Sequence, residues 1–349
     1  MNTASTTSLD EPRLARYLEA QVPGFKGPLS AKKFTGGRSN PTFLIESSSG
    51  KYVLRRKPPG PVLKSAHAVD REFRVISALA ATDVPVARAI HLCTDEDVIG
   101  SMFYLMSFVD GRIFWDAALP ELDRDQRPAV YDAINRSLAA LHSVNIEAVG
   151  LGDFGKPGNY FERQIAIWTR QYQLSATEVI PEMDRLIESL PALTPADDGR
   201  VCLLHGDYRL DNMIFRRDAP EVAALIDWEL STLGHPMADL AYYCMSLRMP
   251  GHGDMKGLGG RDRQALNIPT EEAFIEQYCT RTGQGGIQHW PFYMAFSYFR
   301  LAGILQGVKK RALDGNASSQ RALEVGNMTR PMAELGVAVL DAGHERLSA

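Results

Sequence analysis

A histidine, two aspartates and an asparagine stand inside the apolar stretch LLHGDYRLDNMIF, residues 203–215. His205, Asp207 and Asn212 have the spacing H-x-D-x-x-x-x-N, and Asp227 follows in ALIDWE. Taking an isolated carboxylate out of water is costly, and Asp, Asn and His together offer hydrogen-bond acceptors, donors and metal ligands. A cluster of this kind among large apolar side chains indicates a functional site.

These residue types suit phosphoryl transfer. The strand-like segments NMIF and VAALID flank RRDAPE, a pattern that predicts a hairpin returning Asp227 beside Asn212. Because Mg²⁺ prefers one or two protein oxygens together with phosphate oxygens, Asn212 and Asp227 are the predicted ligands of ATP-bound Mg²⁺. Asp207 is then left to orient the hydroxyl group that accepts the phosphoryl group. The alternative is that Asp207 only caps a turn.

The segments before this cluster have strand patterns. EPRLARYLEAQV predicts a short helix, and LSAKKFTGG, NPTFLIESS and KYVLRRK predict an antiparallel meander because Gly, Ser and Asn separate short β-branched or aromatic runs. HAVDREFRVISALAAT predicts a helix with Val69, Phe73, Ile76 and Leu79 on one stripe. VARAIHLCTD and GSMFYLMSFVDG predict two more strands.

Helical patterns dominate the rest of the chain. Helices are expected at about 124–143 and over NYFERQIAIWTRQYQLS, MDRLIESLPAL, MADLAYYCMSLRM, TEEAFIEQYCTRTG and FYMAFSYFRLAGILQGVKKRAL, with a last helix within 318–341. Residues 249–269, rich in Gly and charge, predict a mobile loop. The sequence therefore predicts an α+β chain of two lobes: a small antiparallel β-rich N-lobe, 1–106, and a larger, mostly α-helical C-lobe, 107–349.

The charge and composition of the chain limit the kinds of binding partner to be expected. A formal net charge of -4 argues against a surface that attracts nucleic acid or anionic membrane as a whole, so a small-molecule partner is expected. The N-terminus has no signal-peptide pattern and no apolar window reaches the ~18 residues of a spanning helix, which predicts a cytoplasmic chain. The four Cys residues form no CxxC pair, so neither a disulfide framework nor a structural zinc site is expected.

At these motifs the chain resembles the aminoglycoside phosphotransferase family of the protein-kinase-like fold. FTGGRSNPTFLIE is similar to the family's phosphate-covering hairpin, YVLRR to its third strand, DREFRVISAL to its C-helix and HPMADLAYY to the helix whose Asp supports the catalytic loop. The resemblance covers about 30–310. It is closest to the phosphotransferase domain at the front of some acyl-CoA dehydrogenases, through GGRSNPTF, VLRRKPPG and HWPFYMAFSYFRLAGILQGV. It implies an ATP- and Mg²⁺-dependent kinase.

The hairpin of the resemblance supplies candidate phosphate contacts. Gly36 and Gly37 permit close approach of the backbone, and Ser39 with Asn40 can point polar groups at phosphate oxygens. An ordinary tight turn is the alternative.

The third strand supplies the candidate nucleotide contacts. Side chains alternate along a strand, so Val53 and Arg55 share a face, where Val53 can pack on adenine while Arg55 reaches the phosphates. Kinase-like folds usually place Lys at this position, paired with a C-helix Glu; here Arg55 stands there, with Glu72 as the expected partner. Lys57 on the same face is the alternative cation.

Other polar residues near the cluster have supporting roles. The resemblance implies that His205 is a scaffold that hydrogen-bonds the backbone and that Asp239 anchors the backbone of the catalytic loop. Glu229 is either a second metal or water contact or a solvated side chain. The aromatic run HWPFYMAFSYF is expected to pack in the core, with a substrate wall as the alternative.

The leading hypothesis is a kinase that transfers the γ-phosphate of ATP to a hydroxyl of a small molecule. The acyl-CoA dehydrogenase resemblance suggests a hydroxyacyl compound or its CoA thioester as substrate. An aminoglycoside kinase is one alternative, and a catalytically impaired nucleotide-binding or scaffold protein is another, because Arg55 stands where Lys is usual. A regulated protein kinase fits poorly, since the chain reads HGD for H-R-D and DWE for D-F-G and has no A-P-E.

Overall fold

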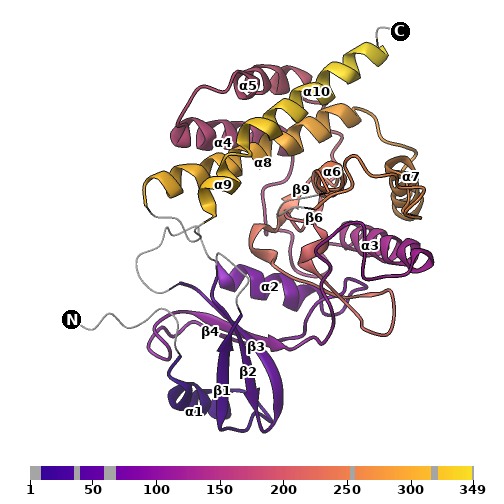
Figure 1. The fold of residues 1–349 in the computed structure, drawn as a ribbon. Helices are drawn as coiled ribbons and strands as arrows, with labels where there is room; N and C mark the ends of the chain where they lie inside the picture. The colour runs from indigo at the N-terminus through magenta and orange to yellow at the C-terminus, as the bar shows by residue number, and fades with distance from the viewer. Residues whose placement is uncertain (1–8, 35–39, 59–67, 252–255, 316–320, 348–349) are drawn as a thin grey trace. The chain divides into compact units, whose positions relative to one another are not determined.

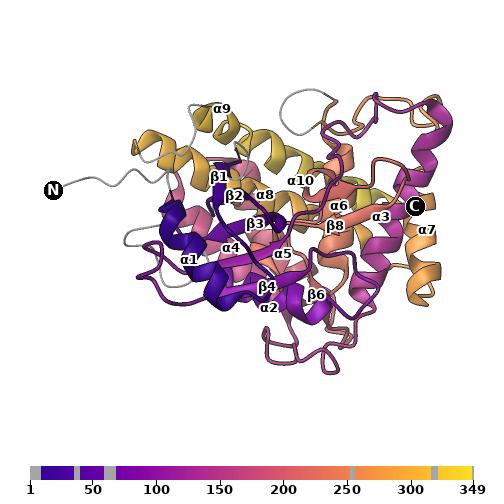
Figure 2. The same cartoon turned by 90° about the horizontal axis from the view of Figure 1, so that it is seen from below.

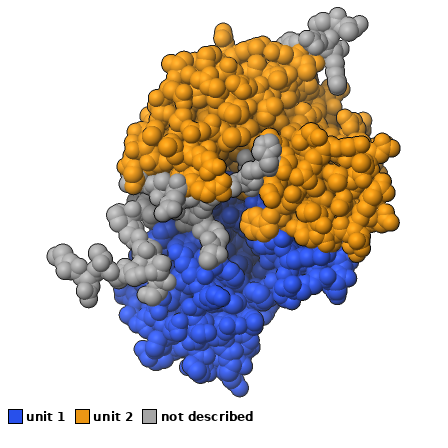
Figure 3. Space-filling model, viewed as in Figure 1, with its two compact units in different colours: residues 1–113, 147–151, 211–231 blue, residues 114–146, 152–210, 232–349 orange. Residues whose placement is uncertain are grey.

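The computed structural model describes residues 9–34, 40–58, 68–251, 256–315 and 321–347. The candidate phosphate-contact residues Gly37 and Ser39 lie outside the described residues. The chain divides into two compact units, coloured separately in Figure 3. Unit 1 comprises residues 1–113, 147–151 and 211–231, and unit 2 comprises 114–146, 152–210 and 232–349. Each unit positions a different group of the candidate site residues.

Unit 1 is built on an antiparallel sheet with the strand order β1-β2-β3-β5-β4. Its strands are β1 (Leu29–Lys33), β2 (Thr42–Ser47), β3 (Gly50–Arg56), β4 (Ala89–Cys93) and β5 (Phe103–Ser107). Ser47 pairs with Gly50 at the end of the β2–β3 hairpin, and β1 pairs with β2, so the predicted meander is confirmed.

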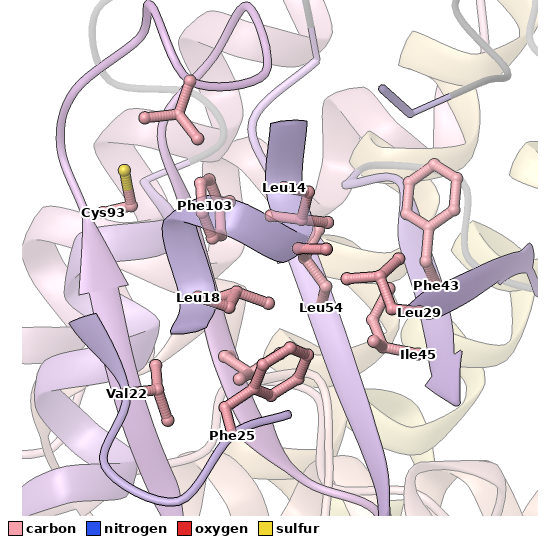
Figure 4. Close-up of a cluster of buried hydrophobic side chains, with 13 residues drawn as sticks. Leu14, Leu18, Val22, Phe25, Leu29, Phe43, Ile45, Leu54, Cys93 and Phe103 are labelled. Carbon is pink, nitrogen blue, oxygen red and sulfur yellow. The ribbon is translucent and has the colours of Figure 1, made fainter. Parts of the chain in front are cut away.

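Helix α1 (Glu11–Gln21) covers one face of this sheet. The Asp10 side chain caps the helix by accepting a hydrogen bond from the Arg13 backbone N–H at 3.0 Å. Leu14 and Leu18 of α1 pack in a buried apolar cluster with side chains of the strands (Figure 4), including Leu54 of β3. Full burial of each such side chain contributes roughly 1.5–3 kcal/mol. Unit 1 therefore has its own hydrophobic core.

Helix α2 (Val69–Leu79) lies on the other side of the sheet from α1 (Figures 1 and 2). Since Leu54 belongs to the α1 cluster and strand side chains alternate, Val53 and Arg55 face away from α1. The predicted helix is confirmed, but its buried face differs from the predicted stripe. Phe73 is only half-buried, whereas the preceding residue, Glu72, is buried. The buried positions are Val69, Glu72, Val75, Ile76 and Leu79.

A hairpin from later in the chain completes unit 1. It consists of β7 (Met213–Phe215) and β8 (Val222–Leu225), which pair antiparallel. Arg112 and Phe215 exchange two backbone hydrogen bonds, at 2.9 and 2.8 Å, and the Leu225 N–H donates to the Pro85 carbonyl at 2.8 Å. The two units therefore do not follow the predicted division into 1–106 and 107–349. Backbone pairing places residues 211–231 in the same unit as the N-terminal residues.

Unit 2 is mostly helical, with a two-stranded ladder of β6 (Cys202–Leu204) and β9 (Thr232–Gly234). The predicted helices are confirmed, except that the last expected helix is two, α9 and α10, separated at 327–328. Helix α8 lies beside α10 (Figure 1), and its aromatic run is buried, which confirms the expected core packing. The helices are α3 (Arg127–His142), α4 (Tyr160–Ser175), α5 (Pro181–Leu193), α6 (Met237–Arg248), α7 (Glu271–Thr282), α8 (Trp290–Leu313), α9 (Ala322–Gly326) and α10 (Thr329–Leu347).

The two units together have the predicted α+β character, an antiparallel sheet in the N-terminal part and helices in most of the remainder. In the part of the chain that the structure describes, no helix has the length and apolarity needed to cross a membrane. All four cysteines are buried and free, as expected from their spacing.

Candidate active site

Arg55 is the centre of an ion cluster in unit 1. Arg55 lies on β3, and its side chain is only 10% exposed. Its Nε lies 2.8 Å from Oε2 of Glu72 on α2, and its Nη2 lies 2.5 Å from Oδ1 of Asp227 and 3.5 Å from Oε2 of Glu229. Packing of α2 on the β3 face that carries Arg55 therefore forms the expected Arg55–Glu72 pair, and the segment after β8 adds the carboxylates of Asp227 and Glu229.

The Glu72 carboxylate also has two neutral donors. The Asn40 amide donates to Oε1 at 2.7 Å, and the Tyr104 hydroxyl donates to Oε2 at 3.2 Å. Asn40 is 1% exposed, so the structure places its amide on Glu72, where the sequence had suggested a phosphate contact. Sequence reasoning missed Tyr104, although its position directly opposite Arg55 in the β3–β5 register follows from the pairing of the strands.

Burial and charge act in opposite directions on this pair. Burial alone would lower the pKa of Arg55, but the carboxylates of Glu72 and Asp227 raise it overall, so the guanidinium stays charged. Burial raises the pKa of Glu72 despite the opposing effect of Arg55 and of the donors Asn40 and Tyr104. The Arg55 guanidinium is therefore a permanent positive charge, and the carboxyl groups of Glu72, Asp227 and Glu229 lie around it.

The hairpin predicted to join Asn212 and Asp227 is present. The Ile226 N–H donates to the Asn212 carbonyl at 3.0 Å, directly before Asp227. Asp227 has a φ of 68°, in the left-handed region that a non-glycine residue enters only when its surroundings impose it. The 3-10 turn η3 (Trp228–Leu230) then carries Glu229 toward Arg55. The backbone therefore has an unusual conformation at Asp227, the residue expected to bind metal.

The donor set fits Mg²⁺ bound together with a nucleotide. One guanidinium faces three carboxyl groups, an excess of negative charge that a divalent cation would neutralise. Within the described residues, no group of three or more His, Cys, Asp or Glu side chains is arranged to hold a metal by itself. A metal on Asn212 and Asp227 would thus take its other ligands from phosphate and water, as Mg²⁺ does in nucleotide sites.

Val53 and Lys57 lie on and just beyond β3. Val53 is buried and pairs with Leu44 on β2 and Met106 on β5. Its contact with adenine stays a prediction. The strand ends at Arg56, so Lys57 follows it, whereas Arg55 lies within the strand and forms the ion cluster.

The catalytic-loop residues lie in unit 2, directly after β6. Asp239, near the start of α6, accepts the His205 N–H at 2.6 Å through Oδ2 and the Gly206 N–H at 2.9 Å through Oδ1. The predicted anchoring role of Asp239 is therefore confirmed. Burial raises the pKa of Asp239, but the hydrogen bond from His142 and the nearby His205 lower it overall, so the carboxylate is held charged.

His205 supports the turn that presents Asp207. Its ring is fully buried, and Nδ1 accepts the Asp207 N–H at 3.3 Å, in agreement with the expected scaffold role. Gly206 has a φ of 83°, which a residue without a side chain adopts at little cost. The loop is thus bent sharply between His205 and Asp207.

The Asp207 side chain is 26% exposed and has defined neighbours. Tyr242 on α6 hydrogen-bonds with it, and Arg209 Nε lies 3.9 Å from its Oδ1. Asp207 therefore combines a fixed backbone with a partly accessible carboxylate, the properties required of a residue that orients a hydroxyl group. Sequence reasoning missed Tyr242.

The fold and these two groups of residues define a protein of the kinase-like phosphotransferase class. A model of the phosphotransferase enzyme family (APH) matches residues 30–295, so the chain belongs to this family. The family is one of phosphotransferase enzymes.

Two curated relatives are similar over nearly the whole chain. Acyl-CoA dehydrogenase family member 10 of Mus musculus is 45% identical over 332 residues, which cover 95% of this chain and 31% of the relative. Acyl-CoA dehydrogenase family member 11 of Homo sapiens is 41% identical over 333 residues, 94% of this chain and 43% of the relative. The chain therefore spans less than half the length of these relatives.

Solved structures share the fold. A Ralstonia eutropha protein provisionally named an aminoglycoside phosphotransferase has a TM-score of 0.88 and 49% identity, with 96% of this chain and 99% of that chain covered. A thermostable mutant of aminoglycoside phosphotransferase APH(4)-Ia, in ternary complex with ADP and hygromycin B, has a TM-score of 0.62 and 13% identity, with 93% and 98% covered. The second likeness establishes the protein-kinase-like fold alone.

Proposed function

We propose that this phosphotransferase uses ATP and Mg²⁺ and transfers the γ-phosphoryl group to a hydroxyl of a small molecule. The observation that carries the proposal is the Arg55 cluster, in which one guanidinium joins the α2 glutamate to Asp227. The proposal assigns Arg55 to the phosphates, and Asn212 and Asp227 to Mg²⁺, whose chemical contribution is to neutralise charge on the transferring group.

Asp207 is the proposed catalytic residue on the acceptor side. Its carboxylate would accept a hydrogen bond from the acceptor hydroxyl and take its proton as the new phosphorus–oxygen bond forms and the bond from the γ-phosphorus to the bridging oxygen of ADP breaks. The anchored backbone at His205 and Gly206 supports this assignment, because positioning is the main resource of this kind of catalysis.

Hydroxyacyl compounds or their CoA thioesters are the proposed substrates. The support is the similarity to acyl-CoA dehydrogenase family members, which carry a matching segment within much longer chains. The Ralstonia eutropha structure favours an aminoglycoside kinase as a second candidate through its name. A scaffold that binds nucleotide without transferring phosphate is the third, since Arg55 replaces the usual Lys.

A screen for ADP release tests the proposal. Purified protein with Mg–ATP is offered hydroxyacyl-CoAs, free hydroxy acids and aminoglycosides, with Asp207→Asn as the blank. We expect release with a hydroxyacyl acceptor, loss of release in the variant, and unchanged binding of Mg–ATP by that variant in calorimetry. Binding without transfer to any acceptor or to water would favour the scaffold, and turnover in Asp207→Asn equal to wild type would remove the catalytic assignment.

The metal assignment has a separate test. Asp227→Ala should weaken Mg–ATP binding itself in calorimetry, with EDTA-treated wild type as the reference for metal-independent binding. Wild-type affinity in this variant would contradict the assignment.

A further inference from the structure

Arg300, on α8, is a buried cation beside the catalytic loop of unit 2. It is 6% exposed, and its Nη2 donates to the Gly206 carbonyl at 2.6 Å. No carboxylate among the described residues forms an ion pair with it. Burying a guanidinium is costly in free energy unless its surroundings compensate the charge. A buried cation in an otherwise apolar stretch of α8 therefore indicates that Arg300 has a function there.

Two aromatic rings provide part of the compensation. The centre of the Arg300 guanidinium lies 5.7 Å from the ring centre of Trp168 on α4 and 5.2 Å from that of Tyr242 on α6. Cations stabilised by ring faces at such distances also fix the orientation of the rings. Arg300 therefore holds Tyr242 in place while it holds the Gly206 carbonyl.

Tyr242 in turn contacts the proposed catalytic residue. Its hydroxyl hydrogen-bonds with Asp207, and burial together with the Asp207 charge raises the pKa of Tyr242, so the phenol remains a neutral donor. Helix α6 presents Tyr242 three residues after Asp239, on the same face. One helix thus holds the loop backbone through Asp239 and the Asp207 side chain through Tyr242.

We propose that Arg300 and Tyr242 are positioning residues for phosphoryl transfer, an inference that rests on the proposed function. Arg300 fixes the Gly206 carbonyl and the Tyr242 ring. Tyr242 holds the Asp207 carboxylate through its hydroxyl. Neither residue takes part in bond making. Both limit the orientations that the carboxylate can adopt.

Steady-state kinetics with Mg–ATP, using water or any acceptor found in the screen, tests the inference. For Tyr242→Phe, which removes a single oxygen, we expect kcat to fall by about 10- to 100-fold, as for small displacements of a catalytic group, with the KM for Mg–ATP within about twofold. Arg300→Met should have the same signature. Arg300→Lys, which keeps the charge, should recover part of the rate.

Tyr131→Phe is the matched control. The Tyr131 hydroxyl is a buried donor to the Ala117 carbonyl at 2.6 Å, and Tyr131 has no assigned part in the loop. This variant should lose stability but keep kcat. Melting temperatures are recorded for every variant, and if Arg300→Met does not fold, Tyr242→Phe alone decides.

The possible results distinguish failure of the positioning roles from failure of the proposed function. A kcat for Tyr242→Phe within twofold of wild type, or a change confined to the KM for Mg–ATP, overturns the positioning roles and leaves the proposed function intact. Wild type releasing no more ADP than Asp207→Asn under every condition ends the proposed function, and the positioning roles with it.

Discussion

Arg55 and Asp227 are joined directly: Nη2 of the arginine lies 2.5 Å from Oδ1 of the aspartate, although 171 residues separate them in the chain. The Nε of the same guanidinium lies 2.8 Å from Oε2 of Glu72. A lysine ammonium is a compact charge, whereas the planar guanidinium presents donors in several directions at once. Arginine at this position therefore links Asp227, which follows the β7–β8 hairpin, to Glu72 on α2, a connection that its planar fork of donors makes possible.

Replacement of Arg55 tests this linkage. Arg55→Met leaves the buried Glu72 without its cation, so we expect a loss of about 3–5 kcal/mol in the free energy of unfolding. Arg55→Lys should lose less, since it keeps the charge. Urea denaturation measures both. The control is Arg185→Met, which breaks an exposed pair with Asp341 and should cost at most about 1 kcal/mol. Equal losses in Arg55→Met and the control would contradict the linkage.

Asp239 gives a prediction about pH. Its pKa is lowered in the folded protein, so the stability it contributes is present above the unfolded pKa, about 3.9, and is lost as the pH falls through the folded value. Asp239→Asn should therefore lose about 2–4 kcal/mol at pH 7, and the difference from wild type should narrow below about pH 4.

Urea denaturation at several pH values measures this difference, with the exposed Asp314→Asn as the control. A difference between wild type and Asp239→Asn that stays constant from pH 7 to pH 3 would show that the charge of Asp239 does not contribute.

Local sequence patterns were sufficient to predict most helices and strands, because each of these segments has its own arrangement of apolar and turn-forming residues. The helix with Asp239 begins after Pro236, and the hairpin around RRDAPE has strand-like residues on both sides. The anchoring role of Asp239 and the Arg55–Glu72 pair were instead predicted from the resemblance to the phosphotransferase family, because they join segments far apart in the sequence.

Contacts that depend on packing between elements could not be predicted in the same way. Asn40 is predicted to contact phosphate, yet its amide donates to Glu72, because the packing of α2 on the sheet brings Glu72 to the residue that precedes Pro41 and β2. Tyr104 becomes a partner of Glu72 through the β3–β5 neighbourhood, which strand patterns do not specify. Tyr242 did carry a usable signal, since D-x-x-Y spacing on a helix places its side chain on the Asp239 face.

The cysteines give a prediction about thiol chemistry. All four are buried, and burial raises the pKa of Cys202 and Cys244 well above the usual value, which suppresses the reactive thiolate. Titration with an aromatic disulfide reagent at pH 8 should label essentially no thiol in the native protein and all four in denaturant. Rapid labelling of the native protein would contradict this burial.

Gly111 tests how the hairpin is held in unit 1. A Cβ at this position would lie 2.4 Å from both the Ile214 Cγ2 and the Phe215 carbonyl oxygen, next to the backbone pair between Arg112 and Phe215. Gly111→Ala must therefore displace β7, and we expect a loss of about 1–3 kcal/mol in stability. Because this hairpin carries Asn212 and Asp227, Mg–ATP affinity in calorimetry should fall as well. Gly285→Ala, whose Cβ would meet no atom within 4 Å, is the control. If both variants keep wild-type stability and affinity, close packing at Gly111 is not what places the hairpin.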